Sequence, residues 1–393
     1  MHRALFLLPL AACASASLDT DDTDLRDTAD ADTDEEPDTD GPFDALAWSD
    51  SAEAATGWGD AQPFDTLRDD LPLEAFAAVS QGRELFMADW VPTSATPSPV
   101  DGLGPYFHAA SCVACHPAVG RPVSLSADGT VAAGLLLRLR HTDDASPDLH
   151  YGNQLQPLAI GGLQPEMSVR WTAVADTPLT LADGSQIARD RVQLALTPAQ
   201  GPVGDNMAVV ARLSPQLVGG ALLDAVATAD LLELEDPQDL DGDGISGRLA
   251  RLGTGTDWQA GRFGWKANQA SLRTQTAAAF AEDMGITSPL HPSSSCTASQ
   301  TDCLALASSS LDLSDSGLDQ VTAYLDALTV PARRPSGDPR DGEGLFAAVG
   351  CADCHLPELH TADNAEPAHT AGLRIRPYTD LLLHDMGEEL ADG

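Results

Sequence analysis

Two short stretches of the chain share one spacing of sulfur and imidazole groups. They are Cys112-Val113-Ala114-Cys115-His116 and Cys351-Ala352-Asp353-Cys354-His355. In a C-x-x-C-H pattern the two thiols can form thioethers with the vinyl groups of a haem, while the adjacent histidine binds the iron. With 7 Cys and 10 His in 393 residues, composition alone would give about 0.003 such sites. The sequence therefore predicts two c-type haems. The proposed attachment residues and proximal ligands are Cys112, Cys115 and His116 for one haem, and Cys351, Cys354 and His355 for the other.

The same cysteine pairs permit two other interpretations. A C-x-x-C pair can perform thiol redox chemistry or contribute to a zinc site, and the two pairs could share one zinc ion. Phe107 and Phe346 precede the two motifs at the same offset. The frame F-x4-C-x2-C-H is therefore an internal repeat.

Methionine is the predicted sixth ligand of each haem iron. Met284 and Met386 each follow a haem motif and each lies in an Asp-Met-Gly run. Thioether ligation raises the potential of a c-type haem and suits electron transfer. Core packing is the alternative role for each methionine, and His384 is the alternative ligand for the second haem.

An acidic, glycine-containing run predicts a cation-binding loop. Asp239, Asp241 and Asp243 are followed by Gly244, in the D-x-D-x-D-G order that places oxygen ligands around a tight turn. The twelfth position is Ala250 rather than glutamate, so we expect calcium in a geometry other than an EF-hand. The alternative is an acidic turn held by hydrogen bonds from the backbone to aspartate.

Cys296 and Cys303 remain outside the haem motifs. In an exported protein they most simply form a disulfide that closes a small loop. A pair of free thiols and a redox-active disulfide are the alternatives.

The N-terminus predicts export. Residues 1–18 contain Arg3, a short apolar run and then Leu10-Ala11-Ala12-Cys13, which resembles a bacterial lipobox. In that interpretation Cys13 carries lipid and anchors the protein to a membrane surface, in the periplasm or cell envelope. The alternative is an ordinary signal peptide cleaved nearby.

The charge pattern predicts an acidic tether and restricts the partners. The chain has a formal net charge of −39. Residues 19–53 include fifteen acidic residues and one basic residue, Arg26. We expect residues 19–70 to be disordered because like charges repel and apolar residues are few. Nucleic acid is excluded as a partner because phosphate binding requires clustered Lys and Arg. A cationic protein partner is compatible with this charge.

The secondary structure expected around the motifs indicates a mainly α protein with two cytochrome-c-like haem domains. Helical spacing over Leu73 to Trp90 makes Phe76, Val79 and Phe86 candidate core residues. Alternation and turn residues over about 131–215 predict a β-rich insertion of short strands and hairpins. The first haem domain is expected over residues 71–333 and the second over 334–393. Because the second contains only 38 residues after His355, we expect it to be truncated at its C-terminus.

Several runs in this order resemble one family. They are Asp101-Gly102-Leu103-Gly104-Pro105, Tyr151-Gly152-Asn153-Gln154-Leu155-Gln156, Asp241-Gly242-Asp243-Gly244-Ile245-Ser246-Gly247-Arg248, Gly261-Arg262-Phe263-Gly264-Trp265-Lys266-Ala267, Asp283-Met284-Gly285-Ile286-Thr287 and Leu381-Leu382-Leu383-His384-Asp385-Met386-Gly387. From about residue 78 onwards, the chain resembles the di-haem c-type cytochrome oxidoreductases. These are peroxidase-like proteins, also called thiol oxidoreductases, and are distant relatives of bacterial di-haem cytochrome c peroxidase.

The resemblance implies two covalent haems and periplasmic electron chemistry. It implies an oxidoreductase that passes electrons between a donor protein and a small oxidant such as peroxide, and a further C-terminal segment that this chain lacks. It does not assign the catalytic residues. The alternatives are a pure electron-transfer protein with two six-coordinate irons, and thiol oxidation by Cys296 and Cys303.

Overall fold

The computed structural model describes residues 4–7, 53–54, 64–94, 98–122, 129–131, 133–142, 146–204, 206–331 and 339–387. The predicted lipidation site Cys13 and most of the predicted tether lie outside these residues. The described α-helices are α1 (Leu73–Met87), α2 (Cys112–Cys115), α3 (Gly220–Asp224), α4 (Thr228–Glu233), α5 (Leu272–Met284), α6 (Thr301–Leu306), α7 (Asp315–Asp326) and α8 (Pro339–Ala348). The 3-10 helices are η1 (Pro117–Val119), η2 (Cys351–Asp353) and η3 (Ala368–Thr370). Among the described helices, none is long and apolar enough to cross a membrane.

The strands are short except in one region. They are β1 (Ala4–Leu7), β2 (Glu53–Ala54), β3 (Tyr106–Phe107), β4 (Leu135–His141), β5 (Gln154–Leu155), β6 (Leu158–Ala159), β7 (Met167–Thr180), β8 (Gln186–Pro198), β9 (Met207–Leu213), β10 (Gly247–Arg248), β11 (Arg251–Thr254), β12 (Asp257–Ala260), β13 (Val330–Pro331), β14 (Leu359–His360), β15 (Arg374–Ile375) and β16 (Leu383–His384). Two sheets have three strands, in the orders β1-β8-β7 and β5-β4-β9, and the other ladders of the described residues have two.

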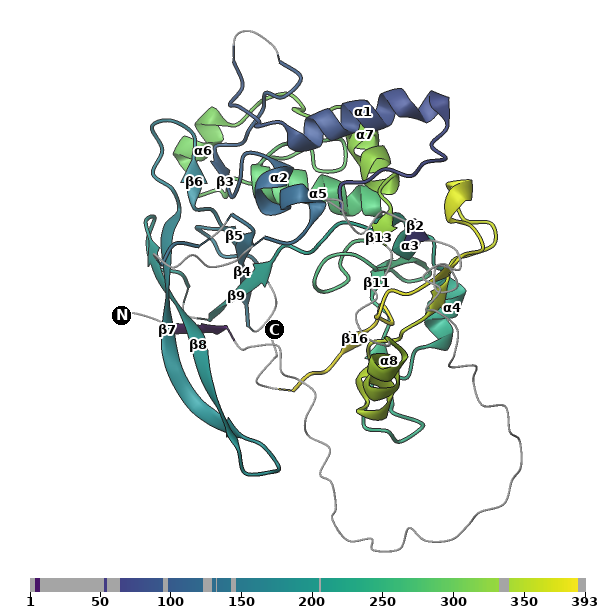
Figure 1. Cartoon of the computed structure of the whole chain (residues 1–393). Helices are drawn as coiled ribbons and strands as arrows, with labels where there is room; N and C mark the ends of the chain where they lie inside the picture. Colours follow the sequence, from purple (N-terminus) through teal and green to yellow (C-terminus); the bar gives the residue numbers. More distant parts are fainter. Residues whose placement is uncertain are drawn as a thin grey trace, which may run out of the picture.

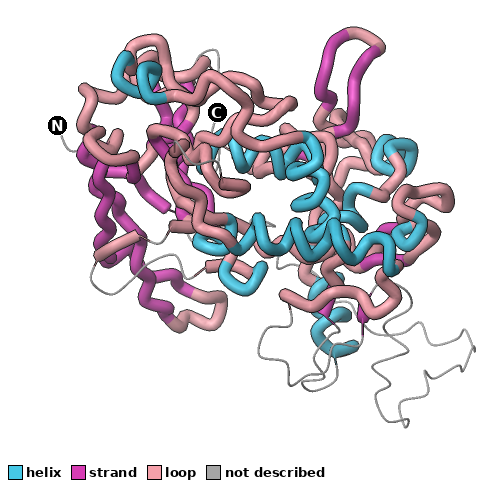
Figure 2. Tube along the Cα trace, turned by 90° about the horizontal axis from the view of Figure 1, so that it is seen from above, coloured by secondary structure: helices cyan, strands magenta, loops and turns pink. Residues whose placement is uncertain are grey.

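The prediction of a mainly α protein was wrong. The structure is 26% helix and 26% strand, with eight helices among the described residues and several small sheets. Much of the strand content comes from residues 135–213, where the sequence predicted short strands. There β7 and β8 form a long antiparallel hairpin whose turn contains Asp183 and Gly184. Figure 1 shows this hairpin projecting from the body, and Figure 2 shows strands on both sides of the helices.

The largest core lies where α1 crosses α7. Val79 and Phe86 of α1 are buried, and the Phe86 ring lies 5.4 Å from the ring of Tyr324 on α7. A Cβ atom on Gly82 would lie 1.8 Å from the carbonyl oxygen of Gln320, so the crossing requires glycine at this position. Phe76 is 56% exposed, which shows that its prediction as a core residue was wrong. The burial stripe of α1 runs through Val79, Gly82 and Phe86 instead.

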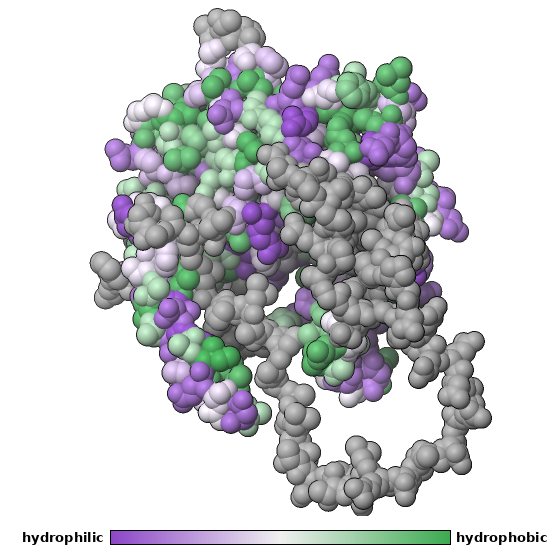
Figure 3. Space-filling view, viewed as in Figure 1, coloured by the Kyte–Doolittle hydropathy of each residue, from purple (hydrophilic) through white to green (hydrophobic). Residues whose placement is uncertain are grey.

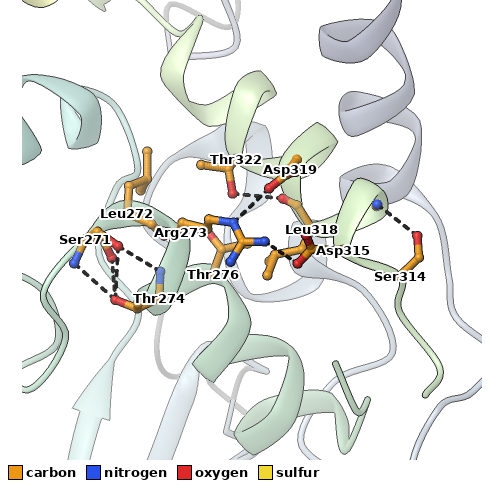
Figure 4. Close-up of polar contacts among 11 residues, drawn as sticks. Ser271, Leu272, Arg273, Thr274, Thr276, Ser314, Asp315, Leu318, Asp319 and Thr322 are labelled. Atoms are coloured by element: carbon orange, nitrogen blue, oxygen red, sulfur yellow. Dashed lines mark hydrogen bonds and ion pairs between the residues drawn. The ribbon is translucent and has the colours of Figure 1, made fainter. Parts of the chain in front are cut away.

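Helix α5 joins this crossing to the rest of the molecule. Its N-terminus is capped by Ser271, whose side chain accepts a hydrogen bond from the backbone N–H of Thr274. Arg273 of α5 then forms ion pairs with Asp315 at 2.5 Å and Asp319 at 2.8 Å, both on α7 (Figure 4). Figure 3 shows hydrophobic and hydrophilic residues interspersed on one face of the folded part. These ion pairs fix the N-terminal end of α5, and Met284 lies at the opposite end of the helix.

Candidate functional site: two haem-attachment motifs

The first C-x-x-C-H motif forms the short helix α2 and the residue that ends it. Cys112 and Cys115 lie one helical turn apart, and His116 is the C-cap. The Cys115 thiol donates to the carbonyl of Ala133 at 3.2 Å, and the hydroxyl of Ser214 donates to the carbonyl of Cys115 at 2.6 Å. These two contacts attach the motif to the residues just before β4 and just after β9.

The imidazole of His116 is oriented by the same connection. Its Nδ1 lies 2.7 Å from the carbonyl oxygen of Pro215. A carbonyl only accepts, so Nδ1 carries the proton and Nε2 keeps its lone pair. Burial lowers the pKa of His116, which favours the neutral imidazole that an iron ligand requires.

The second motif repeats this arrangement with different elements. Cys351 begins η2, and the Nδ1 atom of His355 lies 3.1 Å from the carbonyl oxygen of Tyr378. The ring of Phe346 lies 6.4 Å from the ring of His355 and 5.4 Å from that of Tyr378. Both motif histidines therefore use Nδ1 for one kind of backbone contact and leave Nε2 available, as metal-bound histidines commonly do.

The thiols of the first motif sit where the thiolate form is disfavoured. Burial, helped by the negative charge of Asp283, raises the pKa values of Cys112 and Cys115 to about 12. Dithiol redox chemistry requires a lowered thiol pKa, so this environment opposes that alternative. A neutral thioether fits it.

The two predicted methionine ligands have different surroundings. Met284 ends α5, is 3% exposed and belongs to the same apolar cluster as Cys112 and Val113. Its carbonyl accepts a hydrogen bond from the backbone N–H of Gly104 at 2.9 Å. Met386, by contrast, is 50% exposed. Iron ligation by either residue stays a prediction, with burial near a haem motif favouring Met284.

His108 is a buried residue beside the first motif that the sequence did not single out. It is 3% exposed, and within the described part of the chain neither ring nitrogen has a hydrogen-bond partner. Burial lowers its pKa to about 4. Its backbone N–H donates to the carbonyl of Asp283 at 2.7 Å, which places it next to the end of α5. Burial therefore keeps the imidazole neutral near pH 7.

Two carboxyl groups near this segment have raised pKa values. Asp283 accepts a hydrogen bond from the Gln154 side chain at 2.9 Å, and burial raises its pKa to about 6. Glu166 is 2% exposed, and burial raises its pKa to about 7. Glu166 lines a cleft of about 320 Å³ together with Tyr106, Gln156 and Glu282.

A histidine–carboxylate pair follows the second motif. The Nε2 atom of His384 lies 2.6 Å from Oδ2 of Asp380, and this hydrogen bond raises the pKa of His384. His384 lies in β16, which pairs with β10, and β10 directly follows the predicted cation loop. Sequence analysis considered His384 only as an iron ligand and did not include Asp380.

The predicted cation loop brings together a slightly different set of aspartates. Ligand atoms of Asp236, Asp239 and Asp241 lie within 4.8 Å of one another. The Asp243 carboxylate instead accepts the backbone N–H of Ile245 at 2.7 Å. Backbone N–H groups also donate to the other three, such as that of Leu240 to Asp236 at 2.7 Å. These contacts are those expected for the alternative, an acidic turn held by hydrogen bonds from the backbone to aspartate. Calcium binding stays a prediction.

Cys296 and Cys303 form a disulfide in the structure, across a sequence separation of seven. They lie far along the chain from either motif.

Two histidines held by backbone carbonyls, each next to a pair of cysteines, form the arrangement that two c-type haem sites would require. Residues 202–393 match the family described as di-haem oxidoreductase, putative peroxidase, and this match supports the resemblance seen in the sequence. The matched part contains the second motif, α5, α7 and His384, while the first motif precedes it. Neither the search of curated proteins nor that of solved structures found a match.

Proposed function

We propose that this chain is an exported, peroxidase-like di-haem c-type cytochrome. It would pass electrons between a donor protein and a small oxidant such as peroxide. The observation that carries the proposal is the repeated contact of His116 with the Pro215 carbonyl and of His355 with the Tyr378 carbonyl. The family match adds oxidoreductase chemistry with two haems.

In this proposal the chain holds two haems through the four motif cysteines. A bound c-type haem supplies an iron that takes up and releases one electron. His116 and His355 present Nε2 to the irons, with orientation fixed by their Nδ1 hydrogen bonds. Met284 would close the first site, since it is buried in the same cluster as Cys112.

The second site has the residues that proton transfer requires. Peroxide reduction consumes protons, which a positioned acid–base group can supply. His384 can hold a proton on Nε2, facing the carboxylate of Asp380 at 2.6 Å. With Met386 half exposed, we propose the second site as the one that meets the oxidant and the first as the one that receives electrons.

Electron relay without catalysis is the second candidate. The burial of Met284 beside the first motif favours it, because a closed iron transfers electrons but does not bind a substrate. It would apply to the whole protein only if the second iron were also closed.

Export and partners belong to the same proposal. Covalent haem attachment, the lipobox-like run ending at Cys13 and the acidic segment after it are mutually consistent with a lipid-anchored protein in the periplasm or cell envelope. With a net charge of −39, the chain suits a donor protein that carries a positive surface.

Absorption spectra of the exported protein test the proposal. The variants C112S/C115S and C351S/C354S are each expected to lose one of two covalent haems, while C296S/C303S keeps both as a matched control. Absence of covalent haem from the wild-type protein would refute the proposal.

Carbon monoxide then separates catalysis from relay. We expect the half-reduced and reduced protein to bind carbon monoxide at one haem only, and that spectral change to disappear in C351S/C354S. Two haems that ignore carbon monoxide in every redox state would support electron relay instead.

A further inference from the structure

One face of the sheet β5-β4-β9 carries a cluster of cations. Along β4, Leu135, Leu137 and Leu139 point into an apolar core and are buried. Because side chains alternate across a strand, Arg138 and Arg140 lie on the opposite face. In the β4–β9 register Leu136 pairs with Arg212, so the Arg212 side chain shares that face.

A loop from a distant part of the chain adds to this cluster. The guanidinium of Arg212 lies 5.1 Å from the ring centroid of Trp265. Partial burial, with the positive charges of Arg140 and Arg212, lowers the pKa of the neighbouring Lys266. Burial and the charge of Arg138 lower the pKa of Arg212. The cations are therefore close enough to repel one another.

Two arginines of this cluster differ in their partners among the described residues. Arg138 forms an ion pair with Glu282 at 2.5 Å and donates to Gln154 at 2.8 Å. The Nε atom of Arg140 is buried, and nothing in the described part of the chain accepts a hydrogen bond from it. A buried donor without an acceptor destabilises the folded state. An anionic acceptor would remove that destabilisation and the repulsion together.

The cluster is unusual for this chain. Lys and Arg total 21 against 60 Asp and Glu, so acidic residues are abundant, yet several cations converge on one face. Guanidinium groups bind carboxylates and phosphates with paired hydrogen bonds. The chemistry of the expected ligand is therefore a carboxylate or a similar oxyanion.

Residues that flank the strands of the cluster contact the first C-x-x-C-H motif. Ala133, just before β4, accepts from the Cys115 thiol, and Pro215, just after β9, accepts from His116. Arg212 precedes Pro215 by three residues, or about 10 Å along an extended chain. A haem attached through its vinyl groups to α2 also carries two propionate carboxylates.

We propose that Arg140, Arg212 and Lys266 bind the propionates of the first haem. The inference rests on the proposed function, since it requires a haem at Cys112–His116. The haem attached at the first motif would itself supply the anionic groups that bind this cluster of cations.

The redox potential of the first haem tests the proposal. Reduction adds negative charge at the haem, and nearby cations favour the reduced state. The variants R140M and R212M should therefore lower the midpoint potential of one haem and leave the other unchanged. The affected haem is identified as the one that remains in C351S/C354S. The potential should also become more dependent on pH, because a propionate without its cation gains a higher pKa.

R189M is the matched control, because Arg189 is a cation on the β7–β8 hairpin that pairs with Asp176. It should leave both potentials unchanged. R212K retains the charge and should restore most of the potential lost in R212M. If the methionine variants of the strand residues fail to fold, K266M provides the same test with an exposed side chain, and it should lower the same potential.

A free anion at the cluster would give different results. Sodium phosphate would then raise the melting temperature of the haem-loaded wild type more than sodium chloride does. The two salts would have equal effects on R140M, and the midpoint potentials of wild type and R140M would be the same. That outcome overturns the propionate assignment in favour of an exchangeable anion site. Unchanged potentials without a phosphate effect overturn the inference altogether, although the proposed function stands if both haems are attached. A wild-type chain without covalent haem refutes both.

Discussion

Glu166 should make the stability of the folded protein depend on pH. Its carboxylate oxygens accept hydrogen bonds from the backbone N–H of Gln156 at 2.7 Å and from the side chain of Gln300. The side chain is 2% exposed, and burial raises its pKa from 4.5 to about 7. We expect the variant E166Q to remove this dependence. An amide can accept from Gln156, and the Gln300 amide can turn to accept from it.

The sign follows from proton binding. Between pH 4.5 and 7 the folded state holds a proton on Glu166 that the unfolded state has released, so the free energy of unfolding falls as pH rises through this window. Below it both states are protonated, and above it both are ionised. At about 1.36 kcal/mol per pH unit, the loss across the window is about 3 kcal/mol. For a large domain this corresponds to roughly 6 °C in melting temperature.

Denaturant unfolding of the haem-loaded protein at pH 5, 6, 7 and 8 measures this effect. Other buried groups also titrate, so the quantity to compare is the difference between E166Q and wild type. That difference should rise by about 3 kcal/mol in favour of E166Q from pH 4.5 to 7 and then stay constant. E233Q, which alters an exposed carboxylate on α4, is the control and should show a constant difference. Parallel curves for E166Q and wild type would refute the assignment of a buried, raised-pKa carboxyl to Glu166.

Three further predictions test other parts of the structure. G82A should lower the free energy of unfolding by about 1–3 kcal/mol in denaturant titrations, because its Cβ would overlap the carbonyl of Gln320; an unchanged midpoint would contradict the close α1–α7 crossing. D380N removes the hydrogen bond that raises the pKa of His384, so its loss of stability should be greatest below pH 6.5 and shrink as pH rises; a pH-independent loss would contradict this pairing. C303S should lower the free energy of unfolding by about 2 kcal/mol by removing a short disulfide loop, with no effect on haem content.

The two C-x-x-C-H motifs could be found in the sequence because their chemistry is local. Two thiols and an imidazole within five residues predict covalent haem attachment wherever the chain folds, and the repeat at Cys112 and Cys351 makes chance a poor explanation. The carbonyls that orient the histidines could not be predicted. Pro215 lies 99 residues from His116, and any backbone carbonyl can serve, so no side-chain pattern marks it.

The fold class was mispredicted for a physical reason. Helical periodicity identified α1 and α7, whose amphipathic spacing is clear. The helical content of the whole chain was overestimated because the prediction relied on the helices near the C-x-x-C-H motifs. The long hairpin β7–β8 has many exposed positions, so its alternation of polar and apolar residues carries little information about strand length. Phe76 shows the same limit within a helix, because its spacing from Val79 fits the core stripe but its side chain lies outside the crossing.

The residues that sequence analysis missed share one property. His108, Glu166 and Arg140 each acquire their character from neighbours distant in sequence, and from burial that composition does not reveal. The β4 arginines alternate with leucines as in any half-buried strand. Only the convergence of Arg212 and Lys266 makes them a cluster.

The two C-x-x-C-H motifs lie on either side of the predicted domain boundary at residues 333 and 334, yet the part that carries the second motif shares a core with earlier residues. Val226, Leu231, Leu249 and Ala260 pack in one buried cluster with Leu359, Ile375 and Leu381. The ladder β10–β16 and a bridge between Val226 and Thr361 add backbone hydrogen bonds across the same contact. The second motif is therefore held in place by residues that precede it by about a hundred positions. The family match begins at residue 202, just before this shared core, rather than at the predicted boundary. A fragment that started at residue 334 would expose the apolar side chains of β14 and β15, so the second motif depends on residues 226–260 for its structural support.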